Sequence, residues 1–310
     1  MSSLTPVSLE LQSQDAATFA ERLGSSFSEY GFAVLEDHGV PIDLIARAEE
    51  DARAFFALPE ETKRRYVIEG SGGARGFTAF GTEIAKDAKA HDLKEFWHVG
   101  REVAADHRHA EFMPPNVWPG EIARFRETFE ALFVAFDASG RKVLDGISDY
   151  LGLDRELLRD GVKDGNSVLR LLHYPPIGPD APGVRAGAHE DINTITLLLG
   201  AEEAGLELKN KNGEWIAVAP PDNALVVNIG DMLSRLTNDV LPSTSHRVVN
   251  PPPERRGHAR YSMPFFLHFR PDFVIETLPS CLEGRANRYP EPITAQDFLE
   301  QRLREIGLIT

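Results

Sequence analysis

Residues 260–269, RYSMPFFLHF, alternate with a period of two and therefore predict a β-strand with two different faces. Every second side chain from Tyr261 to Phe269 is apolar, so this face is expected to pack against the rest of the protein. Arg260 and Ser262 lie on the other face, where a guanidinium buried without an anion would be costly. A forked donor beside a hydroxyl suits a ligand carboxylate, so the strand predicts a cavity on this side.

The pattern of the whole chain predicts the fold class. Helical periodicity dominates the first half, and short strand-like segments separated by Gly, Pro and Asn follow from Val168 onward. Helices followed by strands predict an α+β protein whose sheet closes into a barrel or sandwich. We expect one domain, residues 1–310, with a mainly helical part over about 1–165, a strand-rich core over about 166–290 and a C-terminal helix over 291–310. Within the first part we expect helices at 15–30, 41–56 and 120–151, strands at 32–35 and 95–99, and a loop at 71–80.

Composition excludes several classes of partner. The formal net charge of −15 argues against binding to nucleic acid or to an anionic membrane surface. Cys281 is the only cysteine, so no intrachain disulfide can form and a reducing compartment suits the chain. The N-terminus lacks the pattern of a secretory signal, and no apolar run approaches the ~20 residues of a membrane span. We therefore expect a cytoplasmic protein.

Two histidines and one aspartate form a candidate metal site. His189 and Asp191 precede the apolar run 194–199, and side chains at positions i and i+2 of a strand leave the same face. His246 opens another β-rich run, 245–249, and is the third candidate ligand. Two imidazoles and one carboxylate leave other coordination positions of a first-row metal open, as in non-haem Fe(II) oxygenases. The competing interpretation is that these are ordinary polar residues of an acidic loop.

The set His189-x-Asp191, His246 and Arg260-x-Ser262 resembles that of the Fe(II)/2-oxoglutarate-dependent dioxygenases, in the branch that includes isopenicillin N synthase. The resemblance implies that the first three residues bind Fe(II) and that the Arg-x-Ser pair anchors the distal carboxylate of 2-oxoglutarate. Tyr174 is then a further contact for this cosubstrate. The implied fold is a double-stranded β-helix, a jelly-roll variant, with flanking N-terminal and C-terminal helices. The implied activity uses 2-oxoglutarate and O₂, releases succinate and CO₂, and oxidises, by default hydroxylates, a substrate.

The resemblance also suggests where that substrate binds. Arg75 lies in a glycine-bearing loop, and a similar Arg–Gly–aromatic stretch supplies a substrate-carboxylate contact in isopenicillin N synthase. We therefore expect a small carboxylate-bearing substrate held by Arg75, with Arg170 as the second candidate and Trp97 as an apolar wall. The alternative is that Arg75 is a solvated loop residue and Arg170 part of a structural ion pair.

Two other functions are compatible with the same residues. An oxidase of the isopenicillin N synthase type would share these motifs and need no 2-oxoglutarate. A non-catalytic jelly-roll protein that binds a metal or an acidic small molecule is more distant, because a binding module needs no open coordination positions.

Overall fold

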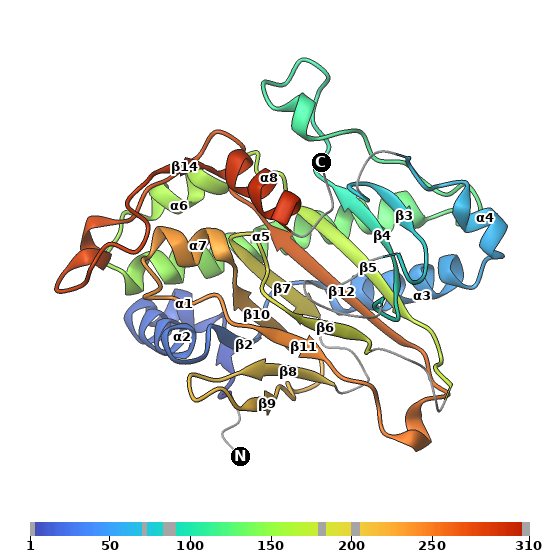
Figure 1. Cartoon of the computed structure of the whole chain (residues 1–310), viewed down its shortest axis with the longest axis horizontal. Coiled ribbons are helices and arrows are strands. Elements are labelled where there is room, and N and C mark those ends of the chain that lie inside the picture. The colour runs from blue at the N-terminus through green and yellow to red at the C-terminus, as the bar shows by residue number, and fades with distance from the viewer. Residues whose placement is uncertain (1–3, 70–72, 83–90, 179–183, 200–204, 306–310) are drawn as a thin grey trace.

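The computed structural model describes residues 4–69, 73–82, 91–178, 184–199 and 205–305, and Figure 1 shows sheets flanked by helices. The large sheet has the strand order β1-β2-β10-β7-β12-β5-β4-β3, and all of its pairs except β1–β2 are antiparallel. In that order its strands are Val7–Ser8, Phe32–Glu36, Leu225–Ile229, Ile195–Leu199, Arg260–Leu267, Val168–Tyr174, Glu95–Gly100 and Gly76–Thr78. A smaller sheet has the order β6-β11-β8-β9, with strands Ala186–His189, His246–Val248, Leu206–Lys209 and Trp215–Ala217. The short strands β13 (Val274–Ile275) and β14 (Ile293–Thr294) pair with each other.

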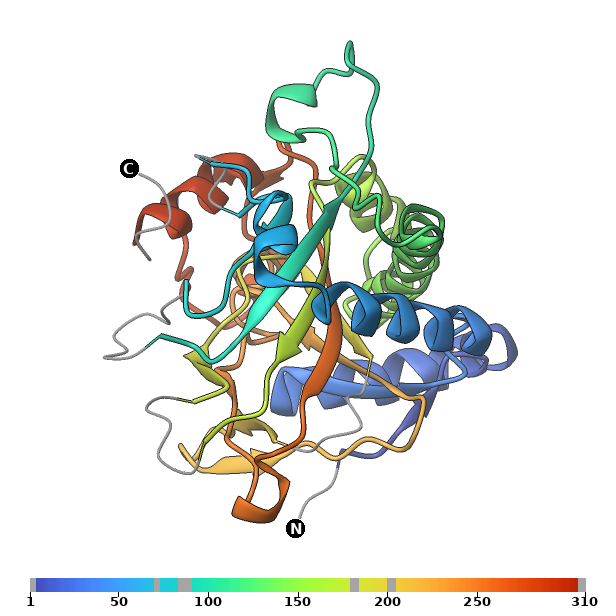
Figure 2. The ribbon, with the colours of Figure 1, turned by 90° about the vertical axis from the view of Figure 1, so that its right-hand side faces the viewer.

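Helices cover the outer face of the large sheet, as Figures 1 and 2 show for α2, α3 and α5. The helices are α1 (Leu11–Gln14), α2 (Ala16–Tyr30), α3 (Ile42–Phe56), α4 (Glu60–Arg64), α5 (Phe125–Tyr150), α6 (Arg155–Val162), α7 (Asp231–Leu236) and α8 (Ala295–Glu305). The apolar face of β12 packs on α5, where the Phe265 ring lies 4.9 Å from Phe133 and 5.6 Å from Phe136. The other face of β12 is left to the interior between the sheets, as its period of two predicts.

The ends of α2 illustrate how the local sequence sets these elements. The Asp15 carboxylate accepts a hydrogen bond from the Thr18 backbone N–H at 3.0 Å and so caps the first turn. Gly31 ends the helix with a φ of 68°, and a Cβ there would lie 2.5 Å from the Pro242 carbonyl oxygen. Phe19, Leu23 and Phe27 then form the buried face of the helix.

The predicted α+β class and jelly-roll core with flanking helices are confirmed. One local expectation is wrong: the predicted loop at 71–80 contains strand β3, whose Phe77 pairs with Trp97 of β4, while residues 71 and 72 lie outside the described part. The predicted C-terminal helix is α8, which begins at Ala295 rather than at 291. Among the described residues, no helix is both long enough and apolar enough to cross a membrane.

Candidate functional site

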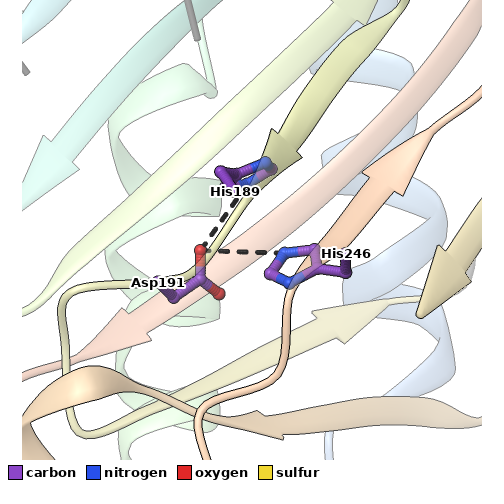
Figure 3. Close-up of side chains that lie close together, drawn as sticks. All are labelled: His189, Asp191 and His246. Carbon is purple, nitrogen blue, oxygen red and sulfur yellow. Dashed lines mark ion pairs between the residues drawn. The ribbon is translucent and has the colours of Figure 1, made fainter. Parts of the chain in front are cut away.

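His189, Asp191 and His246 converge between the two sheets (Figure 3). His189 ends β6 and His246 begins β11, and the two are direct partners in the register of the small sheet. The Nε2 atom of each lies 3.8 Å from Asp191 Oδ1, and the three ligand atoms all lie within 4.8 Å of one another. Asp191 follows the end of β6, so it reaches this point from the connection to β7 and not by alternation along one strand.

Backbone carbonyls orient both imidazole rings. His189 Nδ1 lies 2.8 Å from the Gly187 carbonyl oxygen, and His246 Nδ1 lies 3.1 Å from that of Thr244. A carbonyl can only accept, so each Nδ1 carries the hydrogen and donates it. Each Nε2 therefore presents a lone pair toward the shared space, which is the tautomer that a metal requires.

The charge states also suit a metal. Desolvation, followed by repulsion from His246, lowers the pKa of His189 to about 4, so its ring is neutral near pH 7. Burial by itself would raise the pKa of Asp191. The two histidines and the hydrogen bonds from Thr196 and Asn228 outweigh that burial and hold the pKa below its ordinary value. A neutral His189 imidazole and an ionised Asp191 carboxylate can thus bind a divalent ion without first losing protons.

A cavity between the sheets contains this triad. It is lined by side chains from both sheets and the segments next to them: Phe32, Lys94, Arg170, Leu172, Tyr174, Ala186, His189, Asp191, Thr196, Leu198, Leu206, Asn228, His246, Val248, Arg260, Ser262, Pro264 and Phe266. Three of these residues are basic: Lys94 directly precedes β4, Arg170 lies on β5 and Arg260 begins β12. A cavity with positive charge beside a carboxylate-containing metal site suits anionic small molecules.

The three residues expected to bind 2-oxoglutarate lie together on one wall. Arg260 and Tyr174 are direct partners in the register of β12 and β5, and the Arg260 guanidinium lies 5.0 Å from the Tyr174 ring centre. Arg260 Nη1 donates to Ser262 Oγ at 3.2 Å. All three side chains are buried, so a carboxylate bound here would be shielded from water.

Of the three residues expected to contact the substrate, Arg170 lines the cavity. Its guanidinium lies 4.2 Å from the Phe96 ring centre and 5.3 Å from that of Phe266, and its Nε donates to His98 Nε2 at 2.6 Å. The expectation from sequence did not include His98, Phe96 or Phe266. Alternation along β4 could have indicated two of them, because Phe96 and His98 share one face of that strand.

Trp97 does not form a wall of the cavity, and that expectation is wrong. It leaves the opposite face of β4 and packs in the core beneath the helices, with its ring centre 4.8 Å from Phe55 and 5.4 Å from Phe125. The sequence predicts that Trp97 and its neighbours point to opposite faces, but it does not say which face is the cavity.

Arg75 is neither solvated nor among the residues that line the cavity. Its Nε donates to the Pro114 carbonyl at 3.1 Å and its Nη1 to the Ala74 carbonyl at 2.7 Å. The guanidinium packs directly on Gly100, where any larger side chain would collide with it. Desolvation lowers the pKa of Arg75 to about 10, so the group stays cationic at neutral pH. These contacts fit a residue that fixes the loop before β3, and they contradict the expectation of a direct substrate contact.

Comparison with known proteins agrees with this geometry. The family model described as non-haem dioxygenase in morphine synthesis N-terminal matches residues 4–121, and that of the 2OG-Fe(II) oxygenase superfamily matches residues 165–269. The chain is 34% identical to hxnY of Emericella nidulans, a 2-oxoglutarate-Fe(II) type oxidoreductase, across 91% of this chain and 83% of the relative.

Solved structures show the same relationship. A 2OG-Fe(II) oxygenase family protein from Caulobacter crescentus is 56% identical, with a TM-score of 0.93 that covers 99% of this chain and 100% of the other. A full-length Neurospora crassa protein in complex with alpha-KG, which is 2-oxoglutarate, is 31% identical, with a TM-score of 0.87 over 97% and 95% of the two chains. The chain belongs to the 2OG-Fe(II) oxygenase superfamily. It is an oxidoreductase, a dioxygenase that depends on Fe(II), 2-oxoglutarate and O₂.

Proposed function

We propose that His189, Asp191 and His246 hold the Fe(II) of this dioxygenase. The observation that carries the proposal is the convergence of two imidazole nitrogens and one carboxylate oxygen within 4.8 Å in the cavity. The donor set fits the metal, because both rings are fixed in the tautomer that presents Nε2 and the carboxylate is ionised. Three ligands from one side leave coordination positions for a cosubstrate.

We also propose that Arg260 and Ser262 bind the distal carboxylate of 2-oxoglutarate, with Tyr174 beside it. Iron with O₂ and 2-oxoglutarate supplies the oxidising chemistry, with release of succinate and CO₂. The contribution of the chain is to orient the ligands, to keep the carboxylate out of water and to position one C–H bond of the substrate. Hydroxylation is the default outcome of this arrangement.

Succinate formation from 2-oxoglutarate under air, without any other substrate, tests this assignment. We expect slow turnover by the Fe(II)-loaded protein and its loss in the Asp191→Ala variant. Oxygen consumption that is unchanged when 2-oxoglutarate is left out would favour the oxidase alternative. The absence of turnover with every compound tried, despite stoichiometric Fe(II), would favour a binding protein.

For the substrate, we propose a small molecule with a carboxylate that Arg170 binds. The support is the position of Arg170 on the wall of the triad's cavity, with its guanidinium held by His98 and flanked by two phenyl rings. A planar fork of donors fixed in this way matches the geometry of a carboxylate. The ring of Phe266, which lines the cavity beside Arg170, adds an apolar surface for the rest of the substrate.

A panel of small acids, each paired with its amide, tests this substrate class by the increase in 2-oxoglutarate consumption. We expect acids to stimulate turnover and their amides to do so much less, and Arg170→Leu to abolish the difference. Arg53→Leu, on the helical side of the sheet, is the control with the same change in charge. The Neurospora crassa protein has been crystallised with thymine, so thymine belongs in the panel. Turnover of thymine but of no acid would overturn the carboxylate proposal.

We propose that the protein works in the cytoplasm and binds neither nucleic acid nor membrane. The support is the formal charge of −15 and the single cysteine of the sequence. Fractionation of cells that produce the protein would test the location.

A further inference from the structure

The two oxygens of the Asp191 carboxylate have different surroundings. Oδ1 faces the Nε2 atoms of His189 and His246, at 3.8 Å from each. Oδ2 points away from them and accepts two hydrogen bonds, from Thr196 Oγ1 at 2.5 Å and from Asn228 Nδ2 at 2.8 Å. Figure 3 shows the same orientation, with one oxygen turned toward both rings. Oδ2 is thus held by hydrogen bonds from the protein, whereas Oδ1 faces the two histidine nitrogens.

The two donors to Oδ2 have fixed positions because they come from neighbouring strands of the large sheet. Thr196 of β7 and Asn228 of β10 are direct partners in the register of these strands, and both side chains are buried. Asn193 Nδ2 donates to Thr196 Oγ1 at 3.2 Å. The Thr196 hydroxyl itself has two possible acceptors, Asp191 Oδ2 at 2.5 Å and Asn193 Oδ1 at 3.3 Å, and the shorter contact assigns its hydrogen to the carboxylate. A rigid cross-strand pair, and not a mobile loop, therefore holds Oδ2.

We propose that Thr196 and Asn228 are positioning residues that restrict Asp191 to metal binding through Oδ1 alone and so keep a coordination position open for 2-oxoglutarate. This inference rests on the proposed iron site. A carboxylate can bind a metal through one oxygen or through both. To bind through both, Asp191 would have to give up two hydrogen bonds to a charged group. The buried Asn228 amide would lose this acceptor, and the Thr196 hydroxyl would be left with the longer contact with Asn193 Oδ1 at 3.3 Å. The pair thereby favours the open coordination sphere that a cosubstrate needs.

The test uses the full chain, Fe(II) and 2-oxoglutarate without oxygen. The double variant Thr196→Val/Asn228→Leu removes both donors at similar side-chain volume, and Thr196→Ser keeps the hydroxyl as a matched control. Fe(II) affinity is measured by titration, and 2-oxoglutarate affinity by the visible charge-transfer band of the Fe(II)–2-oxoglutarate complex. We expect the double variant to lose far less Fe(II) affinity than Asp191→Ala and, once it is loaded with Fe(II), to bind 2-oxoglutarate about tenfold more weakly than the wild type. Thr196→Ser should match the wild type in both.

Two results would overturn the proposal. One is unchanged 2-oxoglutarate affinity in the Fe(II)-loaded double variant. The other is a loss of Fe(II) as complete as in Asp191→Ala, since the pair would then be needed for the metal itself. Thermal unfolding of the metal-free proteins checks the fold, and if the double variant is unstable, Thr196→Val alone should show a smaller weakening in the same direction. Failure of the iron site itself is a separate result, because Asp191→Ala would then keep the Fe(II) affinity of the wild type.

Discussion

Replacement of Arg260 by leucine tests the proposed cosubstrate site most directly. The Arg260 side chain is only 3% exposed, and its Nη1 lies 3.2 Å from Ser262 Oγ, so a carboxylate bound there would lose its water and gain a charge-assisted fork. Truncation of one partner in such a buried charged contact costs about 2–5 kcal/mol. Since about 1.4 kcal/mol corresponds to a factor of ten, the Kd of 2-oxoglutarate should rise about 30- to 4,000-fold.

Two further variants should raise the Kd of 2-oxoglutarate by less than Arg260→Leu does. Arg260→Lys keeps the charge but loses the fork and its stacking on Tyr174, so its Kd should lie between those of the wild type and the leucine variant. Ser262→Ala removes one neutral hydrogen-bonding group, about 0.5–1.5 kcal/mol, which corresponds to about 2- to 12-fold. The control is Arg53→Leu, because that guanidinium lies 4.5 Å from the Tyr261 ring centre, and the Tyr261 side chain leaves the opposite face of the same strand.

Isothermal titration of 2-oxoglutarate into the anaerobic Fe(II)-loaded proteins measures these constants, and circular dichroism checks that each variant is folded. The expected order of affinity is wild type and Arg53→Leu, then Ser262→Ala, then Arg260→Lys, then Arg260→Leu. Wild-type affinity in Arg260→Leu would refute the assignment. An equal loss in Arg53→Leu would show that the net charge of the region, and not the fork, determines binding.

Three other results follow from the structure. His246→Ala should lower Fe(II) affinity by more than ~100-fold, because it removes a metal ligand, whereas loss of a hydrogen bond to a ligand costs at most about that much. An anaerobic titration that gives wild-type Fe(II) affinity would contradict the assignment of the triad. Glu95→Gln should lower the free energy of unfolding by about 3 kcal/mol, because it removes the buried carboxylate that lies 2.7 Å from both Lys63 and His173 and leaves Lys63 with the more distant Glu60, at 3.4 Å. Burial by itself would raise the pKa of Glu95. The hydrogen bonds and charges of His173 and Lys63 outweigh burial and hold this pKa below the ordinary 4.5. The difference in denaturant stability between wild type and Glu95→Gln should therefore be full at neutral pH and shrink as the pH falls below that value; a difference that does not depend on pH would refute this. Trp97→Ala should lower the free energy of unfolding by about 3–5 kcal/mol with little change in the substrate KM. A large change in KM without loss of stability would show that Trp97 contacts the substrate after all.

The chemistry of the site could be read from short stretches of sequence. The alternation around Arg260 and Ser262 predicts which side chains share a face, because the pleat of a strand depends only on the local backbone. The residue types at His189, Asp191 and His246 indicate a mixed nitrogen and oxygen metal site. Their convergence does not follow from alternation along a strand, because Asp191 lies in the connection after β6. The fold class follows from the order of helical and strand-like segments, and the structure confirms it. The roles of the individual site residues stay predictions that the experiments above address.

The partners of each side chain were decided only by the tertiary structure. Trp97 and His98 are neighbours in the chain, yet one packs beneath helices and the other holds Arg170 in the cavity. Likewise nothing near Asp191 in the sequence identifies Asn228, 37 residues away, as the donor that fixes its second oxygen. Local periodicity determines that two side chains point to opposite faces. Which face becomes the cavity, and which distant strand supplies a partner there, depends on the register and closure of the two sheets, and these are set by contacts between segments far apart in the chain.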